Sequence, residues 1–131
     1  MSPAILIDTH VFVWALSAPQ KVPTAAWPYL RDPHQKLLLS VASAWELAIK
    51  AARGKITLRG GVGGFVGEGC RKTGVALLGI DLAHTVEVQA LPHHHRDPFD
   101  RMLIAQARVD DLAVLSYDRL FDAYDIERVG V

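Results

Sequence analysis

Four short apolar runs constrain the fold of this chain more than any other feature. They lie at 4–7, 37–39, 75–80 and 112–115. A short run that is apolar at nearly every position is typical of a strand buried on both faces, as in a parallel sheet. A weaker run at 126–129 predicts a short fifth strand.

Helical patterns fill the intervals between these runs. They are expected over 10–16, from Thr24 onward with Pro28 early in the helix or breaking it, over 44–53, over 81–90, and from Asp97 through 107. Ser40 or Ser43 can cap the helix at 44–53, and Asp97 followed by a proline has the sequence of a helix start. Strands that alternate with helices imply crossover connections. We therefore predict a single domain, residues 1–131, with a three-layer α/β/α fold and a mainly parallel sheet of four to five strands flanked by helices.

A glycine-rich stretch lies between the second and third strand candidates. Six of the residues in 60–69 are glycine. Each glycine in a helix interior costs roughly 1 kcal/mol relative to alanine. We therefore expect this stretch to form a loop or a poor, mobile helix.

Composition favours a folded, intracellular protein. Half of the residues are hydrophobic, and 14 Lys and Arg balance 14 Asp and Glu. These values exclude a disordered chain and argue against a blanket polyanion binder. The start of the chain has no basic segment before its apolar run, so no signal peptide is expected, and no run approaches the ~20 residues that span a bilayer. We predict a cytoplasmic protein with no membrane partner.

The balanced charge conceals an asymmetry along the chain. Residues 1–80 hold nine Lys and Arg against four Asp and Glu, a net of +5, whereas residues 81–131 hold five against ten, a net of −5. The basic excess is concentrated between Lys50 and Lys72. Such a pattern suits an acidic site beside a basic surface, and solvated helix faces are the alternative explanation.

Four carboxylates are expected to converge at one edge of the sheet, where the carboxyl ends of parallel strands place functional groups. Asp8 and Asp118 follow strand candidates, Glu46 lies early in the helix after the second strand, and Asp100 lies in the first turn of the helix before the fourth. Clustered carboxylates repel one another, and a divalent cation is the usual relief. Hard oxygen ligands without a cysteine pair select Mg²⁺ or Mn²⁺, and such an ion favours hydrolysis of a phosphodiester.

Three of these four acids also have an explanation without catalysis. Glu46 can form an i,i+4 pair with Lys50, Asp100 can favour the helix dipole, and Asp118 can be a turn or cap residue. Asp97 is explained fully as an N-cap. Only Asp8, an acid that ends a buried strand, has few structural uses.

The run of histidines at 93–95 raises the question of a zinc site. Adjacent histidines in a loop, with no cysteine partner, are weak support for structural zinc. We expect instead a loop beside the acidic site whose histidines bond a carboxylate or a phosphate. His10 has the same two options beside Asp8.

Four segments of the chain carry a recognisable pattern: Ile7–His10, Ser43–Lys50, His94–Ala107 and Ser116–Asp118. Together they resemble the PIN-domain family, and within it the VapC-type toxins of bacterial toxin–antitoxin pairs. The segment at 94–107 is the most specific of them, and the resemblance extends over essentially the whole chain. Where the family often has Asn or Thr, this chain has His10.

The resemblance implies a Mg²⁺- or Mn²⁺-dependent endoribonuclease that forms homodimers and is blocked by a cognate antitoxin. The acidic residues of the family correspond to Asp8, Glu46, Asp100 and Asp118, which become the expected catalytic and metal-binding residues. Asp97 matches a further acid of the family, in a supporting role. We also expect the hydroxyls of Thr9 and Ser116 to orient ligands or phosphate.

Three hypotheses follow. The first is a ribonuclease toxin in which water attacks phosphorus. The second is a catalytically inactive PIN-like module that binds RNA or an antitoxin, against which the presence of all four acids argues. The third is a metal-dependent phosphatase or DNase, because metal-site chemistry reads the phosphate and not the sugar.

Overall fold

A five-stranded parallel sheet forms the centre of the computed structural model, which describes residues 4–130. Residues 1–3 and 131, at the two ends of the predicted domain, lie outside the described residues. They include the first residues of the segment from which no signal peptide was expected. The strands run in the order β3-β2-β1-β4-β5, with all neighbouring pairs parallel. Their bounds are β1 Ile5–Ile7, β2 Leu37–Ser40, β3 Ala76–Leu78, β4 Ala113–Leu115 and β5 Arg128–Val129. The predicted parallel α/β fold is therefore confirmed.

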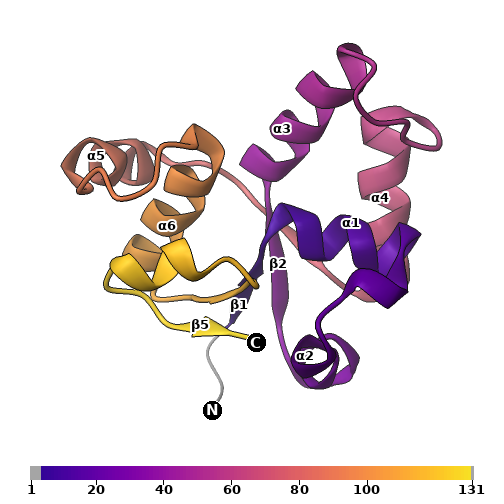
Figure 1. Cartoon of the computed structure of the whole chain (residues 1–131), viewed down its shortest axis with the longest axis horizontal. Helices are drawn as coiled ribbons and strands as arrows, with labels where there is room; N and C mark the ends of the chain where they lie inside the picture. Colours follow the sequence, from indigo (N-terminus) through magenta and orange to yellow (C-terminus); the bar gives the residue numbers. More distant parts are fainter. Residues whose placement is uncertain (1–3, 131) are drawn as a thin grey trace.

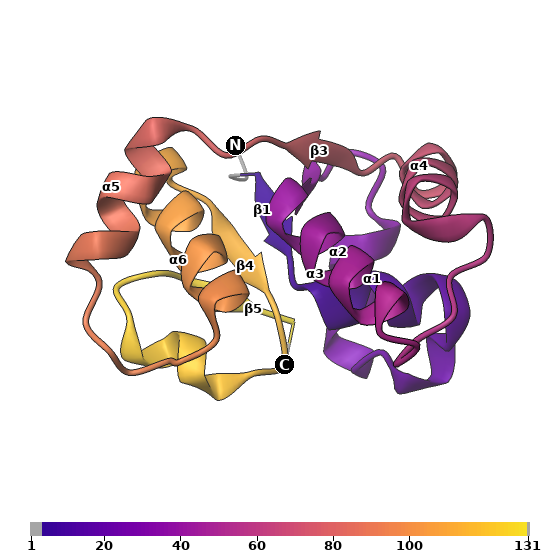
Figure 2. The ribbon, with the colours of Figure 1, turned by 90° about the horizontal axis from the view of Figure 1, so that it is seen from above.

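Helices cover both faces of this sheet (Figure 1). Seen from above, α5 and α6 lie on one side and α1 to α4 on the other (Figure 2). The helices are α1 Thr9–Ser17, α2 Trp27–Arg31, α3 Val41–Ala52, α4 Gly61–Thr73, α5 Leu82–Ala90 and α6 Pro98–Asp110. Short 3-10 turns occupy Pro19–Lys21, Thr24–Ala26 and Arg119–Ala123. None of the helices among the described residues combines the length and apolar character needed to cross a membrane.

Alternation along the central strands divides the core into two layers, because successive side chains of a strand point to opposite faces. In β1, Ile5 and Ile7 pack with Phe12 of α1, whereas Leu6 packs with Ile104 of α6. All of these side chains are buried. This double burial explains why β1, β2 and β4 are continuously apolar in sequence. The prediction of a strand buried on both faces is wrong for the run at 75–80, because β3 lies at the edge of the sheet and Leu77 is 53% exposed.

Helix starts follow the expected capping residues. The Ser40 hydroxyl accepts a hydrogen bond from the Ala42 N–H at the start of α3, so Ser40 and not Ser43 is the N-cap. The Asp97 carboxylate caps α6 in the same way. Ser40 is also the last residue of β2, so α3 begins at the carboxyl edge of the sheet.

The glycine-rich stretch was predicted as a loop or a poor helix, and the structure places most of it in the regular helix α4. Its low helix propensity is overridden by packing against α1. Val66 of α4 is buried, and the Phe65 ring meets Phe12 edge-to-face. Gly69 lies so close to α1 that a Cβ there would come within 2.5 Å of the Leu16 side chain. Glycine thus permits the close approach of α4 to α1 at this position. Of the two alternatives predicted for this stretch, the helix is observed and the loop is wrong.

Candidate active site

Asp8 stands at the centre of the carboxyl edge of the sheet. It follows β1, the middle strand, and its side chain caps α1 by accepting from the His10 N–H. The carboxylate is buried, and Ser116 after β4 donates its hydroxyl to the Asp8 Oδ2 over 2.6 Å. Burial raises the pKa of Asp8, and the Ser116 hydrogen bond and the nearby His10 partly oppose that rise.

Glu46 approaches Asp8 from α3. Glu46 is only 5% exposed, and its Oε2 lies 2.9 Å from the Nζ of Lys50, one turn along the helix. The i,i+4 pair that could explain Glu46 without catalysis is therefore present. It does not remove Glu46 from the acidic group, because the negative charge of Glu46 also raises the pKa of both Asp8 and Asp100.

His95 joins the remaining two carboxylates. Its Nε2 lies 3.0 Å from the Asp100 Oδ2 and 3.4 Å from the Asp118 Oδ2. Its Nδ1 accepts a hydrogen bond from the Asp97 N–H, so in the neutral ring the proton is on Nε2. His95 therefore donates toward Asp100 and Asp118 and holds these two carboxylates together.

Asp100 is strongly perturbed by its surroundings as well. Burial, followed by the negative charges of Asp8, Asp97, Glu46 and Asp118, raises the pKa of Asp100 from 3.8 to about 8. The structure thus brings all four predicted acids into one mutually repelling group. Tyr117 lies close enough to share this field, because burial and the charges of Asp8, Asp118 and Asp100 raise its pKa.

The three residues predicted in supporting roles lie around this group. Asp97 accepts from the N–H groups of Phe99 and Asp100, so its side chain serves the cap while its charge acts on Asp100. Ser116 bonds Asp8 and also accepts from the Asp118 N–H. Thr9 instead donates to the Ser43 hydroxyl over 2.7 Å, which ties α1 to α3.

The donor set suits a hard divalent cation. Carboxylate oxygens of Asp100 and Asp118 lie within 4.8 Å of each other and of a ring nitrogen of His95, and Asp8 and Glu46 add buried carboxylates beside them. Because the Nε2–H of His95 donates toward Asp100 and Asp118, His95 orients these carboxylates, and their oxygens are the candidate ligands. Carboxylate oxygens are the ligands that Mg²⁺ and Mn²⁺ prefer. An ion of charge +2 would also remove the repulsion that raises the pKa of Asp100. The residues present therefore fit such a cation.

The histidine run separates in the structure. His94 packs edge-to-face on Tyr124, whereas His95 is buried between carboxylates. The expectation that a histidine of this loop bonds a carboxylate is thus met by His95. Among residues 4–130, only His95 of the three belongs to a group of potential metal ligands, and its companions are two carboxylates that come from other elements.

Two buried residues hold the loop that carries His95, and the sequence reasoning missed both. The Tyr124 hydroxyl accepts from the His95 N–H over 2.8 Å, and the Arg101 guanidinium donates to the carbonyls of Pro92, Val88 and Leu91. The available signal was Arg101 itself, a cation one residue after Asp100 on a helix that is otherwise buried there.

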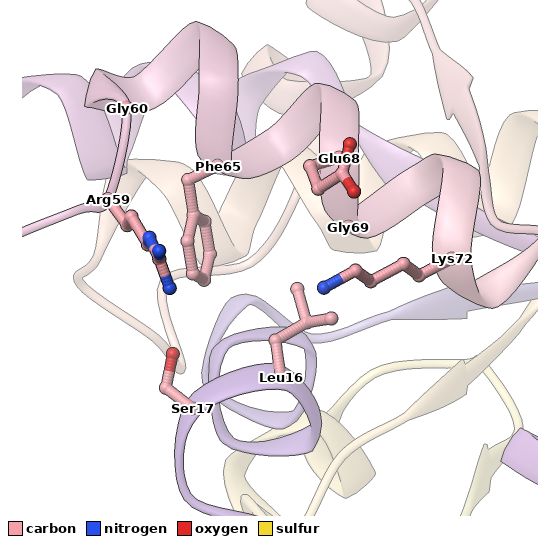
Figure 3. Close-up of a pocket in the computed structure, with 8 residues that line it drawn as sticks. All are labelled: Leu16, Ser17, Arg59, Gly60, Phe65, Glu68, Gly69 and Lys72. Carbon is pink, nitrogen blue, oxygen red and sulfur yellow. The ribbon is translucent and has the colours of Figure 1, made fainter.

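A separate hollow lies away from the acids, between the end of α1 and α4. It has a volume of about 540 Å³, and none of the four carboxylates lines it. Figure 3 shows Arg59, Phe65 and Lys72 extending toward Leu16 and Ser17 at the end of α1. Its lining combines apolar side chains with Arg59, Lys72 and Glu68, and it is distinct from the acidic site.

Comparisons with known proteins agree with this architecture. Residues 5–127 match the family model of the PIN domain. No curated protein matches the sequence significantly.

Several solved structures share the fold at low sequence identity. One is a crystal structure of VapBC2 from Rickettsia felis bound to a promoter DNA fragment, with a TM-score of 0.73, 10% identity, and coverage of 95% of this chain and 96% of that one. A second is FitAcB from Neisseria gonorrhoeae, with a TM-score of 0.65, 20% identity, and coverage of 95% and 96%. A third is DNA-bound VapBC from Salmonella typhimurium, with a TM-score of 0.64, 14% identity, and coverage of 98% and 97%.

Proposed function

Since this chain belongs to the PIN-domain family, we propose that it is a VapC-type toxin that acts as a Mg²⁺- or Mn²⁺-dependent endoribonuclease. One observation carries the proposal: Asp8, Glu46, Asp100 and Asp118 share one buried site in which repulsion and burial raise the pKa of Asp100 to about 8. Such perturbed acids in a shared site are typical of a functional centre.

Asp8, Asp100 and Asp118 would hold the cation, and Glu46 would hold a second one or position the attacking water. A bound ion of this kind lowers the pKa of a coordinated water and polarises a phosphoryl oxygen. The products of in-line water attack at phosphorus would carry a 5′-phosphate and a 3′-hydroxyl.

The chain's own residues prepare this site. The Ser116 hydroxyl fixes the orientation of Asp8, and the Nε2–H of His95 fixes Asp100 and Asp118. Lys50 holds Glu46 at the side of the site that faces α3. Side chains held in this way need little rearrangement when substrate binds, which lowers the cost of reaching the reactive geometry.

The partners follow from the same proposal. We propose a cytoplasmic location, where an RNA substrate is available. A cognate antitoxin is proposed as its protein partner, supported by structural neighbours that are VapBC and other toxin–antitoxin complexes. We also propose that the single domain of residues 1–131 forms a homodimer, which light scattering on the purified protein would test.

The test is cleavage of a labelled single-stranded RNA by purified protein with Mg²⁺ or Mn²⁺. Asp8→Asn should abolish cleavage while the circular dichroism spectrum stays unchanged. Asp125→Asn is the matched control, because Asp125 is exposed and has no side-chain hydrogen bond or ion pair among residues 4–130. Full cleavage by Asp8→Asn, after contaminating nucleases are removed, would contradict the proposal.

Two further substrates separate the alternatives. Single-stranded DNA and a small phosphomonoester are offered under the same conditions, and turnover of either at a rate rivalling RNA would identify a DNase or phosphatase. Toxicity that persists in Asp100→Ala at normal expression would identify an inactive binding module instead.

A further inference from the structure

An exposed tryptophan stands beside the acidic site. Trp45 immediately precedes Glu46 on α3, and its residue is 60% exposed. Its ring meets Phe99, which immediately precedes Asp100 on α6, in an edge-to-face contact with centroids 5.2 Å apart and planes at 79°. This contact holds the indole in place and leaves much of its surface open to solvent.

Three cations gather next to this aromatic pair. Gly54, at a φ of +73°, reverses the chain after α3, and the Lys55 N–H bonds the Lys50 carbonyl over 3.0 Å. This turn returns Lys55 toward Lys50 and Arg53. Arg53 and Lys55 are exposed, and neither has a carboxylate within 4 Å among residues 4–130.

A shallow hollow of about 210 Å³ connects these cations to the acidic site. Its lining combines basic, acidic and aromatic side chains: Lys50, Arg53, Lys55, Glu46, Asp97 and Phe99. Glu46 belongs both to this hollow and to the carboxylate group. A ligand lying in the hollow therefore continues directly into the acidic site.

We propose that this face binds single-stranded RNA beside the bond to be cleaved, with one base stacked on Trp45 and backbone phosphates against Lys50, Arg53 and Lys55. The inference rests on the proposed function, which it deepens by naming the surface that holds the substrate. Aromatic platforms combined with basic grooves are the general means of holding single strands, because every base has a π-face and every linkage a negative charge.

Charge and continuity favour RNA over a protein segment as the occupant. Arg53 and Lys55, which have no carboxylate partner among the described residues, match a phosphate backbone, and the Nζ of Lys50 offsets the charge of Glu46 beside them. The carboxylates alone would repel such a backbone. The hollow also shares Glu46 with the site that is proposed to act on RNA. Trp45 would thus position substrate and would not take part in the chemistry.

The binding test uses a short, mixed-sequence, fluorescein-labelled single-stranded RNA and protein carrying Asp8→Asn to prevent cleavage. In that background, Trp45→Ala should weaken RNA affinity roughly 5- to 100-fold, which corresponds to the loss of one stacked base. Trp45→Phe should weaken it less, because phenylalanine keeps a stacking face. Leu82→Ala is the matched control, since Leu82 is 80% exposed but lies on α5.

Two more measurements separate stacking from charge. Replacing Arg53 and Lys55 together by alanine should lower the slope of log affinity against log salt by about 0.7 for each phosphate that the variant no longer neutralises. In the protein that keeps Asp8, Trp45→Ala should raise KM for RNA cleavage more than it lowers kcat. A purely structural role for Trp45 would not raise KM selectively, and cations that do not contact phosphates would leave the salt slope unchanged.

Unchanged RNA affinity in Trp45→Ala overturns the inference. Unchanged RNA affinity with weaker binding of the cognate antitoxin also overturns it, and assigns the face to protein docking. Failure of the proposed function has a different signature: RNA cleavage that survives Asp8→Asn, whatever Trp45 does to binding. Loss of RNA affinity in Trp45→Ala supports the inference in either case.

Discussion

Replacing Asp100 by asparagine should stabilise the protein in the absence of divalent metal. The carboxyl of Asp100 has its pKa raised to about 8, first by burial and then by the charges of Asp8, Asp97, Glu46 and Asp118. In the unfolded chain the same group ionises near 3.8. Between these two pH values the folded state binds the proton more tightly, so the contribution of Asp100 to stability falls as pH rises. Asparagine resembles the protonated carboxyl and does not carry this cost.

The size of this stabilisation at pH 7 follows from the difference between pH 7 and the unfolded-state pKa of 3.8. From 3.8 to pH 7 is 3.2 pH units, and at about 1.36 kcal/mol for each unit the upper limit at pH 7 is about 4 kcal/mol. The Asp100 side chain is 18% exposed, and solvent screening reduces the expected gain to ~2 kcal/mol. The gain should be negligible near pH 4 and largest near pH 8.

Urea unfolding in EDTA at several pH values measures this gain, with Asp125→Asn as the matched control. Addition of Mn²⁺ should then reverse the order of stability. The wild type should gain about 2.7 kcal/mol at a metal concentration 100 times its Kd, whereas Asp100→Asn should gain much less. A variant that is less stable than the wild type in EDTA at pH 7 would refute the argument that burial and repulsion oppose ionisation of Asp100.

Two further predictions concern packing and the orientation of Asp8. Gly69→Ala should lower the free energy of unfolding by ~1–3 kcal/mol, because the added Cβ would overlap the Leu16 side chain. Gly67→Ala in the same helix is the control: a Cβ there has nothing within 4 Å, so the variant should raise the free energy of unfolding by up to ~1 kcal/mol. Equal effects of the two variants in urea unfolding would contradict the close contact of α4 with α1. Ser116→Ala removes a hydrogen bond that lowers the pKa of Asp8, so the acidic limb of the profile of kcat/KM against pH should move to higher pH, and an unmoved limb would show that Ser116 does not act on Asp8.

The fold was predictable because its signals are local. An apolar run such as 112–115 identifies a buried strand, and the pair Asp97-Pro98 identifies a helix start without any knowledge of the rest of the chain. The helix α4 was not predictable in this way, since the reason for Gly69 is a contact with α1, far away in sequence. Propensity describes the segment alone, and here tertiary packing decides.

In the candidate site, too, some residues could be predicted from local sequence and others depend on tertiary contacts. Acids at strand ends indicate the edge where they meet, because parallel topology brings those ends together. The role of His95 depends instead on the path of its loop, which Tyr124 and Arg101 hold through backbone hydrogen bonds. Three adjacent histidines look alike in sequence, and only these contacts direct one of them to Asp100 and Asp118.

The basic first part of the chain and its acidic second part lie side by side where α3 meets α6. The net of +5 in residues 1–80 and of −5 in residues 81–131 cancels over the molecule, yet the hollow beside Trp45 places Arg53 and Lys55 of the first part next to Asp97 of the second. Net charge is therefore a poor guide to polyanion binding here. An RNA strand that approaches this face meets unpaired cations before it meets carboxylates, and added salt should weaken that approach more than it weakens the buried site.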